Sequence, residues 1–393
     1  MFLSENNISA FWSQCRKRAN EFAREIIAWR REFHKYPELG FEERVTSRKI
    51  QEILKRLKIP FQVFGGTGVV ACLTGRKPGL IVGLRADMDA LPIQEATGLP
   101  FASCKPGCMH ACGHDGHMAT ALGVAAILAE ERDYLSGGIK LIFQPAEEKP
   151  PGGAQEVIRA GALDDVQKLV GFHYFSHIPA GKYWIGEGPV MAATDRFTIE
   201  VLGKGGHGST PHLTADPILC ASFMVTQINT IVSRQIDPQK SAVVSLGSVR
   251  GGDAFNIIPD RVNISGTVRT FEESVRKRVV ISLKKICQAA SALGCSAHLN
   301  FEEYCPATVN NVSLSKKILA ISRKILGDTF LIRFHPIMGG EDFAFLAERV
   351  PACYIFVGVG KDCGNHHSST FRLNESVLTP TAGYLACLLA ALT

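Results

Sequence analysis

Apolar positions along the chain follow two patterns, one typical of helices and one typical of buried strands. Helical spacing, with intervals of i, i+4, i+7 and i+11, is clearest at Phe22, Ile26, Trp29 and Phe33. The short continuous runs that predict buried strands are Val69–Leu73, Leu80–Leu84, Ile139–Phe143 and Leu169–Phe172. Helical segments such as His117–Glu130 separate several of these runs. Apolar strands that alternate with helices predict an α/β fold whose sheet is covered on both faces.

The middle of the chain has a different pattern. Phe197, Ile199 and Val201 alternate with polar residues, which predicts a strand with one face in water. The elements that follow give the order β-α-β-β-α-β, which is that of a ferredoxin-like unit. We therefore expect a small α+β domain at 192–304, inserted into a larger α/β domain formed by 1–191 and 305–393.

Composition and charge narrow the class of protein. The 393 residues are 46% hydrophobic and 20% charged, which excludes a disordered, collagen-like or coiled-coil protein. The net charge is only +6 and the basic residues are scattered, so we expect no binding to nucleic acid.

The length of the apolar stretches and the distribution of the cysteines indicate the cellular compartment. The longest apolar stretches, Ala119–Ala129 and Ala382–Leu392, fall short of the roughly 20 residues of a membrane-spanning helix. The first ten residues lack the apolar core of a signal peptide. The 12 cysteines are thinly spread, so we expect reduced thiols in a soluble, cytoplasmic protein without membrane contact.

Candidate metal ligands are concentrated in one short segment. Three histidines, a cysteine and an aspartate lie within the nine residues Met109–His117, just before a predicted helix. Thiolate and imidazole are groups that hold zinc or a similar divalent ion. The alternative is a glycine-rich start of a helix with His114 and His117 on one face, but the density of donors favours a metal site.

Further candidates follow other predicted strands. Glu147 and Glu148 come directly after one apolar strand, where one carboxylate could bind a metal while the other acts as a general base. The alternative to a metal site is that these are two solvated glutamates at the start of a helix. The remaining candidates are His173 at the end of another strand, the pair Glu341–Asp342, and the pair His366–His367. Side chains at the ends of strands in an open α/β sheet are expected to meet at one edge.

Five motifs together resemble those of one family. They occur in a fixed order at Arg85–Pro92, Met109–His117, Phe143–Glu148, Gly203–Pro211 and Gly339–Phe343. The chain resembles aminoacylase/carboxypeptidase-type metallopeptidases, in the branch of hippurate hydrolases, N-acyl-amino-acid amidohydrolases and auxin-conjugate hydrolases. The resemblance covers about 20–390, and it implies a zinc-peptidase-like catalytic domain with an inserted ferredoxin-like lid or dimerisation domain.

The resemblance also implies a site with two divalent ions, Zn, Mn, Co or Ni. The ligands carried over by motif are Cys112, His114, Glu148, His173 and His367, with Glu147 as the general base. Cys112 stands where the wider family has a metal-bridging aspartate. Asp87 and Asp89 stand where that family has a His-x-Asp pair, and we expect them to orient a ligand at the catalytic site. Alignment to Phe371 favours His367 over His366 as the metal ligand.

The implied reaction is hydrolysis of an N-acyl amino acid to a carboxylate and a free amino acid, by a water that the two ions activate. His207 would stabilise the oxyanion, and in the family it often comes from the partner subunit. Asn256 resembles the residue that holds the substrate carboxylate. Arg269 is a weaker candidate for that task, since it could equally be a cation on the wet face of its strand. We expect a homodimer or homotetramer.

Other classes of function remain as alternatives. One is a dipeptidase or aminopeptidase of the same family, which would cleave unblocked peptides. Another is a catalytically inactive metal-binding module, against which the intact Glu147–Glu148 pair argues. A zinc ribbon built on Cys104, Cys108 and Cys112 is disfavoured, because their spacing is not that of a ribbon and a second cysteine pair is lacking.

Overall fold

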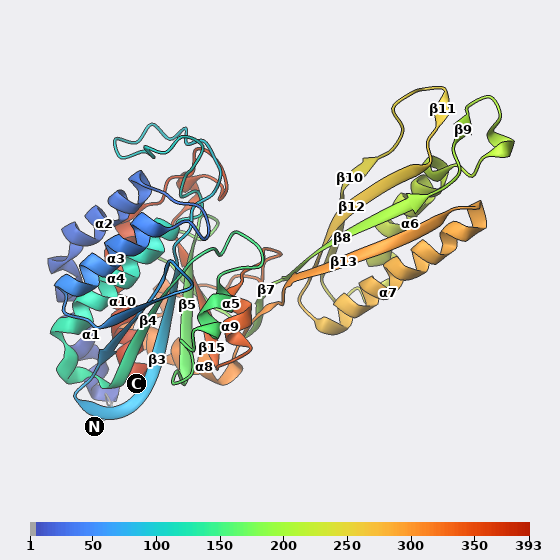
Figure 1. Cartoon of the computed structure of the whole chain (residues 1–393). Helices are drawn as coiled ribbons and strands as arrows, with labels where there is room; N and C mark the ends of the chain where they lie inside the picture. Colours follow the sequence, from blue (N-terminus) through green and yellow to red (C-terminus); the bar gives the residue numbers. More distant parts are fainter. Residues whose placement is uncertain (1–4) are drawn as a thin grey trace. The chain divides into compact units, whose positions relative to one another are not determined.

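The computed structural model describes residues 5–393 and divides into two compact units (Figure 1). The first unit comprises the chain up to Val190, Val309–His335 and Asp342–Thr393. The second comprises Met191–Thr308 and Pro336–Glu341. Each unit has its own sheet and its own hydrophobic core.

The first unit is built on a seven-stranded mixed sheet with the order β1-β2-β4-β3-β5-β15-β6. Its strands are β1 (Phe61–Phe64), β2 (Gly68–Thr74), β3 (Lys77–Asp87), β4 (Ser136–Gln144), β5 (Lys168–Phe175), β6 (Tyr183–Ile185) and β15 (Ala352–Gly358). The four central strands, β4, β3, β5 and β15, are parallel. Their carboxyl ends therefore lie at one edge of the sheet, and this is where an open α/β sheet binds ligands.

Helices cover both faces of this sheet. The helices of the unit are α1 (Glu5–Glu21), α2 (Ala23–Lys35), α3 (Arg44–Arg56), α4 (His114–Glu130), α5 (Ala154–Arg159), α8 (Val312–Leu326), α9 (Phe343–Ala347) and α10 (Leu378–Leu392). Phe172 of β5 points into the main core with α4, whereas a side chain at the neighbouring Gly171 would meet Phe343 of α9. Successive strand residues point to opposite faces, so α9 covers the face opposite α4. The sheet thus has the two-sided cover that its continuous apolar strands predict.

One helix in the described part of the chain is long and apolar enough to cross a membrane, judged by length and composition alone. Its 18-residue window is Glu375–Leu392, longer than the apolar stretch that the sequence indicates. Inside the fold, 72% of this window is buried, and α10 packs against α1 and α4. It is therefore a core helix of the first unit.

The second unit is a four-stranded antiparallel sheet with two helices. Its strand order is β10-β12-β8-β13, and the strands are β8 (Ala193–Leu202), β10 (Ala242–Arg250), β12 (Arg261–Thr270) and β13 (Ser296–Cys305). The two helices are α6 (Pro217–Gln235) and α7 (Glu273–Ala289). Phe197, Ile199 and Val201 of β8 are buried in the core beneath these helices, as their alternation predicts. The β-α-β-β-α-β order confirms the ferredoxin-like prediction.

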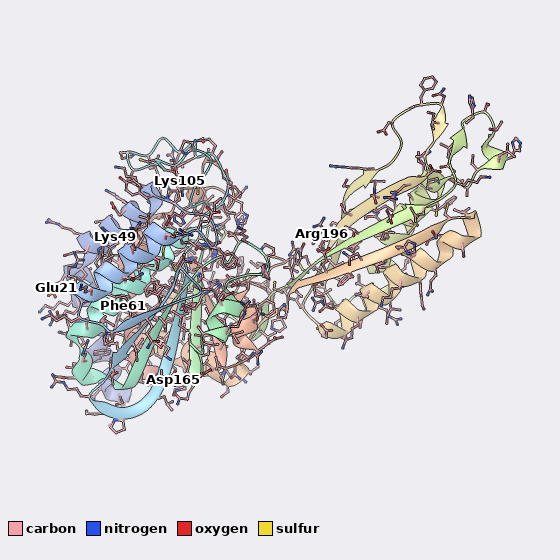
Figure 2. The ribbon with its side chains drawn as sticks, viewed as in Figure 1. Glu21, Lys49, Phe61, Lys105, Asp165 and Arg196 are labelled. Atoms are coloured by element: carbon pink, nitrogen blue, oxygen red, sulfur yellow. The ribbon has the colours of Figure 1, made fainter. Side chains whose placement is uncertain are left out.

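Two short ladders complete the strands. They are β14 (Thr308–Asn310) with β7 (Gly188–Met191), and β11 (Ile257–Ile258) with β9 (Gly206–His207). Polar side chains such as Glu21, Lys105 and Asp165 project from the outside of the first unit (Figure 2).

Candidate metal centre

The candidate ligands of the first unit lie beyond the carboxyl ends of its parallel strands. β3 ends at Asp87 and β4 at Gln144, and these two residues lie opposite each other in the ladder. The loops that follow carry Asp89 and the Glu147–Glu148 pair, while His173 lies near the end of β5. One sheet edge therefore brings together donors that are far apart in sequence.

Cys112 is common to two groups of donors. The ligand atoms of Cys112, His114 and His173 all lie within 4.8 Å of one another, and those of Cys112, Glu148 and His367 do the same. Cys112 Sγ is 3.4 Å from His173 Nε2. Of the five side chains that motif comparison assigns as ligands, the other four thus lie around the sulfur atom of Cys112. A group shared in this way could bridge two ions.

The histidine rings are oriented as metal ligands usually are. His114 Nδ1 is 3.0 Å from the carbonyl oxygen of Asp89, and His173 Nδ1 is 2.8 Å from that of Tyr174. Because a carbonyl oxygen only accepts hydrogen bonds, Nδ1 donates in both rings. Nε2 then faces the donor cluster, and in His114 this atom is buried without a hydrogen-bond partner. A backbone acceptor on one nitrogen and an open second nitrogen fit a bound metal.

The two adjacent histidines after β15 have different surroundings. His367 Nε2 is 3.0 Å from Glu148 Oε1, and its backbone N–H donates to Ala111 O at 2.9 Å. His366 Nε2 instead accepts from the backbone N–H of Ser176 at 3.2 Å. Only His367 joins the donor groups found among residues 5–393.

His117, which the sequence offers as a further candidate, has both ring nitrogens engaged. Its Nδ1 is 2.5 Å from Asp87 Oδ1, and its Nε2 accepts from the backbone N–H of Tyr174 at 3.1 Å. The ring is fully buried. His117 therefore links the start of α4 to β3 and β5, although its ring also lies in one donor group with Asp87 and His114.

Asp342 of the Gly339–Phe343 motif also holds neighbouring groups in position through hydrogen bonds. It accepts hydrogen bonds from Arg85 Nη2 at 2.8 Å, from Gln144 Nε2 at 2.7 and 2.8 Å, and from the backbone N–H of Ala154 at 3.0 Å. Arg85 also donates to Asp87 Oδ2 at 2.6 Å. The motif thus anchors the ends of β3 and β4.

Asp89 contacts both His114, at the start of α4, and Glu148, in the loop after β4. Its Oδ1 is 3.3 Å from His114 Nδ1, and its Oδ2 accepts the backbone N–H of Glu148 at 2.9 Å. Both carboxylate oxygens are therefore directed at residues that carry ligands. This geometry suits a residue that orients ligands.

A buried ionic network behind His114 was missed by the sequence analysis. Asp115 Oδ2 lies 2.9 Å from Arg30 Nε and 2.7 Å from His34 Nδ1, and His34 Nε2 lies 3.2 Å from Glu95 Oε1. Burial would raise the pKa of Asp115, but Arg30 and His34 hold it well below the usual range. The available signal was a polar pair at i and i+4, Arg30 and His34, on the apolar face of a predicted helix.

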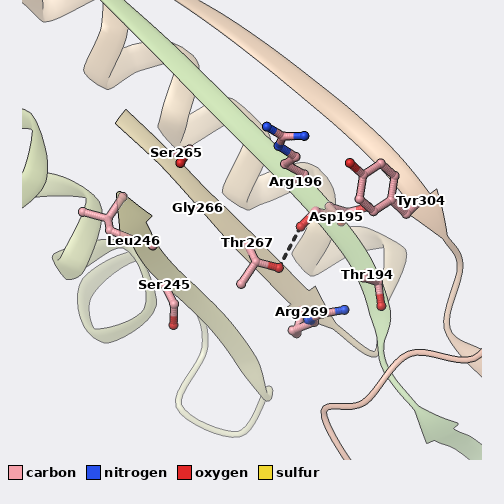
Figure 3. Close-up of a pocket in the computed structure, with 11 residues that line it drawn as sticks. Thr194, Asp195, Arg196, Ser245, Leu246, Ser265, Gly266, Thr267, Arg269 and Tyr304 are labelled. Carbon is pink, nitrogen blue, oxygen red and sulfur yellow. Dashed lines mark hydrogen bonds between the residues drawn. The ribbon is translucent and has the colours of Figure 1, made fainter. Parts of the chain in front are cut away.

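Three other candidates belong to the second unit. His207 is exposed on β9, and its Nδ1 lies 2.8 Å from the hydroxyl oxygen of Ser209. Asn256 is close to it, because the N–H of Gly208 donates to Asn256 O at 2.8 Å. Arg269 lines an open hollow of about 410 Å³ on the face of the second sheet (Figure 3), where burial lowers its pKa.

Comparisons with known proteins identify the chain. Residues 83–391 match the peptidase family M20/M25/M40. The chain belongs to this family. It is 38% identical to the N-acetylcysteine deacetylase of Bacillus subtilis (strain 168) over 368 residues, 93% of this chain and 96% of that protein. It is 44% identical to the N-acyl-L-amino acid amidohydrolase of Geobacillus stearothermophilus over 295 residues, 74% of this chain and 79% of that protein.

A solved structure supports the same conclusion. The Bacillus subtilis YXEP protein, described as a dinuclear metal binding peptidase of the M20 family, superposes with a TM-score of 0.83 at 35% identity, covering 94% of this chain and 98% of that one. The predicted family and fold class are confirmed. The chain is a metal-dependent hydrolase of amide bonds, built on a family fold that binds two metals.

The pKa values of the candidate ligands reflect the charge of the site. Burial lowers the pKa of His114, but Asp87, Asp89 and Glu148 outweigh burial and raise it to about 10. Burial and neighbouring carboxylates raise the pKa of the Cys112 thiol well above its usual range. The metal-free site therefore retains both protons near neutral pH. The same negative potential would stabilise a divalent cation.

Metal binding should accordingly release protons. Zn²⁺ added to metal-free protein near neutral pH should displace protons from the candidate ligands, His114 and Cys112 among them, because metal ligands must be deprotonated. Since both pKa values are raised, the apparent affinity should weaken as the pH falls. Calorimetry in buffers of different ionisation enthalpy measures this release. Cys112→Ser should change the number of protons released and Cys104→Ser, at an exposed thiol, should not; zero release would contradict the assignment.

Proposed function

We propose that this protein hydrolyses the amide bond of N-acyl amino acids, such as N-acetyl or N-benzoyl amino acids, to a carboxylate and a free amino acid. The observation that carries the proposal is the position of the Glu147–Glu148 pair. Glu148 Oε1 faces His367 Nε2 at 3.0 Å, and carboxylate oxygens of both glutamates lie within 4.8 Å of His114. One glutamate can thus bind a metal while its neighbour stays available for proton transfer.

We assign the metal site by the same reasoning. The proposed ligands of two divalent ions are Cys112, His114, Glu148, His173 and His367. The buried Nε2 of His114 and the shared position of Cys112 support this set. Zn, Mn, Co and Ni all suit thiolate and imidazole donors. When bound, such ions polarise an amide carbonyl and lower the pKa of water.

The residues of the chain have separate tasks in this mechanism. Glu147 takes the proton from the attacking water and returns it to the departing amine. Asp89 keeps His114 and the Glu148 backbone in place through its two carboxylate oxygens. His207 of the second unit would donate to the developing oxyanion, and Asn256 and Arg269 would hold the substrate carboxylate. A movement that brings second-unit residues to the substrate fits the general behaviour of closing domains.

We further propose a homodimer or homotetramer that forms through the second unit, and a cytoplasmic location. Large apolar side chains are exposed on this unit, with Phe255 fully exposed and Leu219 and Phe223 about half exposed. Leu219 and Phe223 are four residues apart on α6 and so lie on one face of it, and adjoining exposed apolar side chains are typical of association surfaces. Cys15, Cys353 and Cys387 are buried free thiols, which suits a reducing compartment.

A substrate panel tests the function. N-acetyl and N-benzoyl amino acids should be cleaved, chelators should abolish the activity, and Mn, Co, Ni or Zn should restore it. Product amino acid can be measured by amine-reactive detection. Cleavage restricted to peptides with a free amino group would indicate the dipeptidase or aminopeptidase alternative. Activity that is indifferent to chelation would overturn the metal assignment, and no turnover on any amide would favour a non-catalytic module.

Glu147→Gln tests the general base. The variant should bind metal as the wild type does but lose about 10²–10⁴-fold in kcat, because an amide cannot accept the proton. Elemental analysis and steady-state kinetics measure the two effects. Glu148→Gln is the matched comparison, since it should lower metal content. Near-normal turnover by Glu147→Gln would reject the assignment.

His207→Ala tests the oxyanion role. Loss of a preorganised donor should reduce kcat by about 10²-fold while metal content is unchanged. His212→Ala is a suitable control, because His212 is also exposed, five residues away in the same unit, and should be neutral. A loss of metal in His207→Ala would show instead that this histidine is a ligand.

A further inference from the structure

The turn that carries the Glu147–Glu148 pair has an unfavourable backbone conformation. Ala146, directly before Glu147, is buried and has φ of 50°, in the left-handed region that residues with a Cβ rarely adopt. Such a conformation persists only where the surrounding structure enforces it, and it is concentrated at functional sites. Contacts on Ala146 must therefore hold the turn.

A buried glutamate holds the amide of Ala146. The backbone N–H of Ala146 donates to Glu43 Oε1 at 2.8 Å, across 103 positions of sequence. The other carboxylate oxygen of Glu43 accepts the hydroxyl of Thr67, also at 2.8 Å. Glu43 has no exposed surface, so a missing partner would leave a buried polar group unsatisfied. On the other side, the carbonyl oxygen of Ala146 accepts the N–H of Gly153 at 2.9 Å.

Glu147 is thereby flanked by two anchored amides. Its preceding residue, Ala146, is held by Glu43, and its following residue, Glu148, donates its N–H to Asp89 Oδ2 at 2.9 Å. Each amide is fixed by a buried carboxylate from a different segment of the first unit. Rotation of the turn about Glu147 would break one of these two bonds.

We propose that Glu43 is a positioning residue, which sets the direction of the Glu147 carboxylate through the amide of Ala146. The proposal rests on the proposed role of Glu147 as general base. Proton transfer requires the base within hydrogen-bonding reach of the water, so a small displacement of the turn should affect turnover far more than binding of metal or substrate.

The loop before Glu43 packs closely against the same turn. A Cβ added at Gly40 would lie 3.0 Å from the Cβ atoms of Ala146 and Lys149. The backbone oxygen of Glu38 accepts the N–H of Ala90, next to Asp89, at 2.8 Å. The segment 38–43 therefore supports both anchors of Glu147. Gly40→Ala should displace the turn without removing any hydrogen-bonding group.

The contacts of Glu43 predict that glutamine can replace it. The amide oxygen of glutamine can accept from Ala146, and its NH₂ can donate to the Thr67 hydroxyl, which can act as acceptor. Burial raises the pKa of Glu43, so a neutral side chain is also suited to this environment. Alanine offers neither contact. If Glu43 acts only by positioning the turn, the Glu43→Gln enzyme should keep its activity and the Glu43→Ala enzyme should lose it.

The experiment compares kcat, KM and metal content of the holoenzyme on N-acetyl amino acids. Glu43→Ala should lose about 10- to 100-fold in kcat, as expected for a misplaced catalytic group, with KM and metal content close to wild type. Glu43→Gln should restore kcat. Glu42→Ala, at the exposed neighbouring glutamate, should match the wild type. If Glu43→Ala does not fold, Gly40→Ala replaces it and should show the same selective loss of kcat.

A double variant shows whether Glu43 acts through Glu147. In the Glu147→Gln background, Glu43→Ala should cost far less than in the wild type, since the group it positions is already disabled. Equal losses in both backgrounds, full activity of Glu43→Ala, or a loss explained by missing metal would each overturn the proposal. An inactive wild type would instead overturn the proposed function itself, so the two failures are distinct.

Discussion

The hydrogen bonds of Asp89 are the interaction on which the site depends. One carboxylate oxygen faces the Nδ1 atom of His114, and the other accepts the backbone N–H of Glu148. His114 begins α4, whereas Glu148 follows β4, so these bonds join a helix and a strand that are otherwise separate in sequence. Because Asp89 is buried, neither contact can be exchanged for water without cost. The relative position of the imidazole of His114 and the backbone of Glu148 is fixed in this way.

The acids around the site differ in what compensates their charge. Asp115 is balanced by Arg30, and Asp342 by Arg85, so protein cations and hydrogen-bond donors compensate these charges within the fold. Glu148 instead lies beside imidazoles and a thiol. Its Oε1 is 3.0 Å from His367 Nε2 and 4.0 Å from His114 Nε2, and it shares a donor group with Cys112. A divalent cation would stabilise such a cluster of donors. The arrangement of permanent cations thus separates the supporting network from the metal centre.

The features that could be predicted from the sequence are those that are encoded within short segments of the chain. The α/β pattern, the ferredoxin-like order and the family motifs are local, and the structure confirms the fold that they predict. The donors lie together in the structure because strand ends converge on one edge. The supporting roles of His117 and Asp342 were not predicted, since a motif does not reveal which nitrogen or oxygen already has a partner. Glu43 and Ala146 are 103 residues apart, and no spacing rule connects them.

The roles proposed for Glu147 and Arg269 require different precision in the position of the side chain. A general base must lie within hydrogen-bonding reach of the reacting water, so its neighbouring amides are held by buried carboxylates inside one unit. Recognition of a charged carboxylate tolerates longer and more variable distances, because attraction between charges falls off slowly. Arg269, half-buried and on the strand of a separate unit, suits this second task. The backbone on either side of Glu147 is thus held by hydrogen bonds within the first unit.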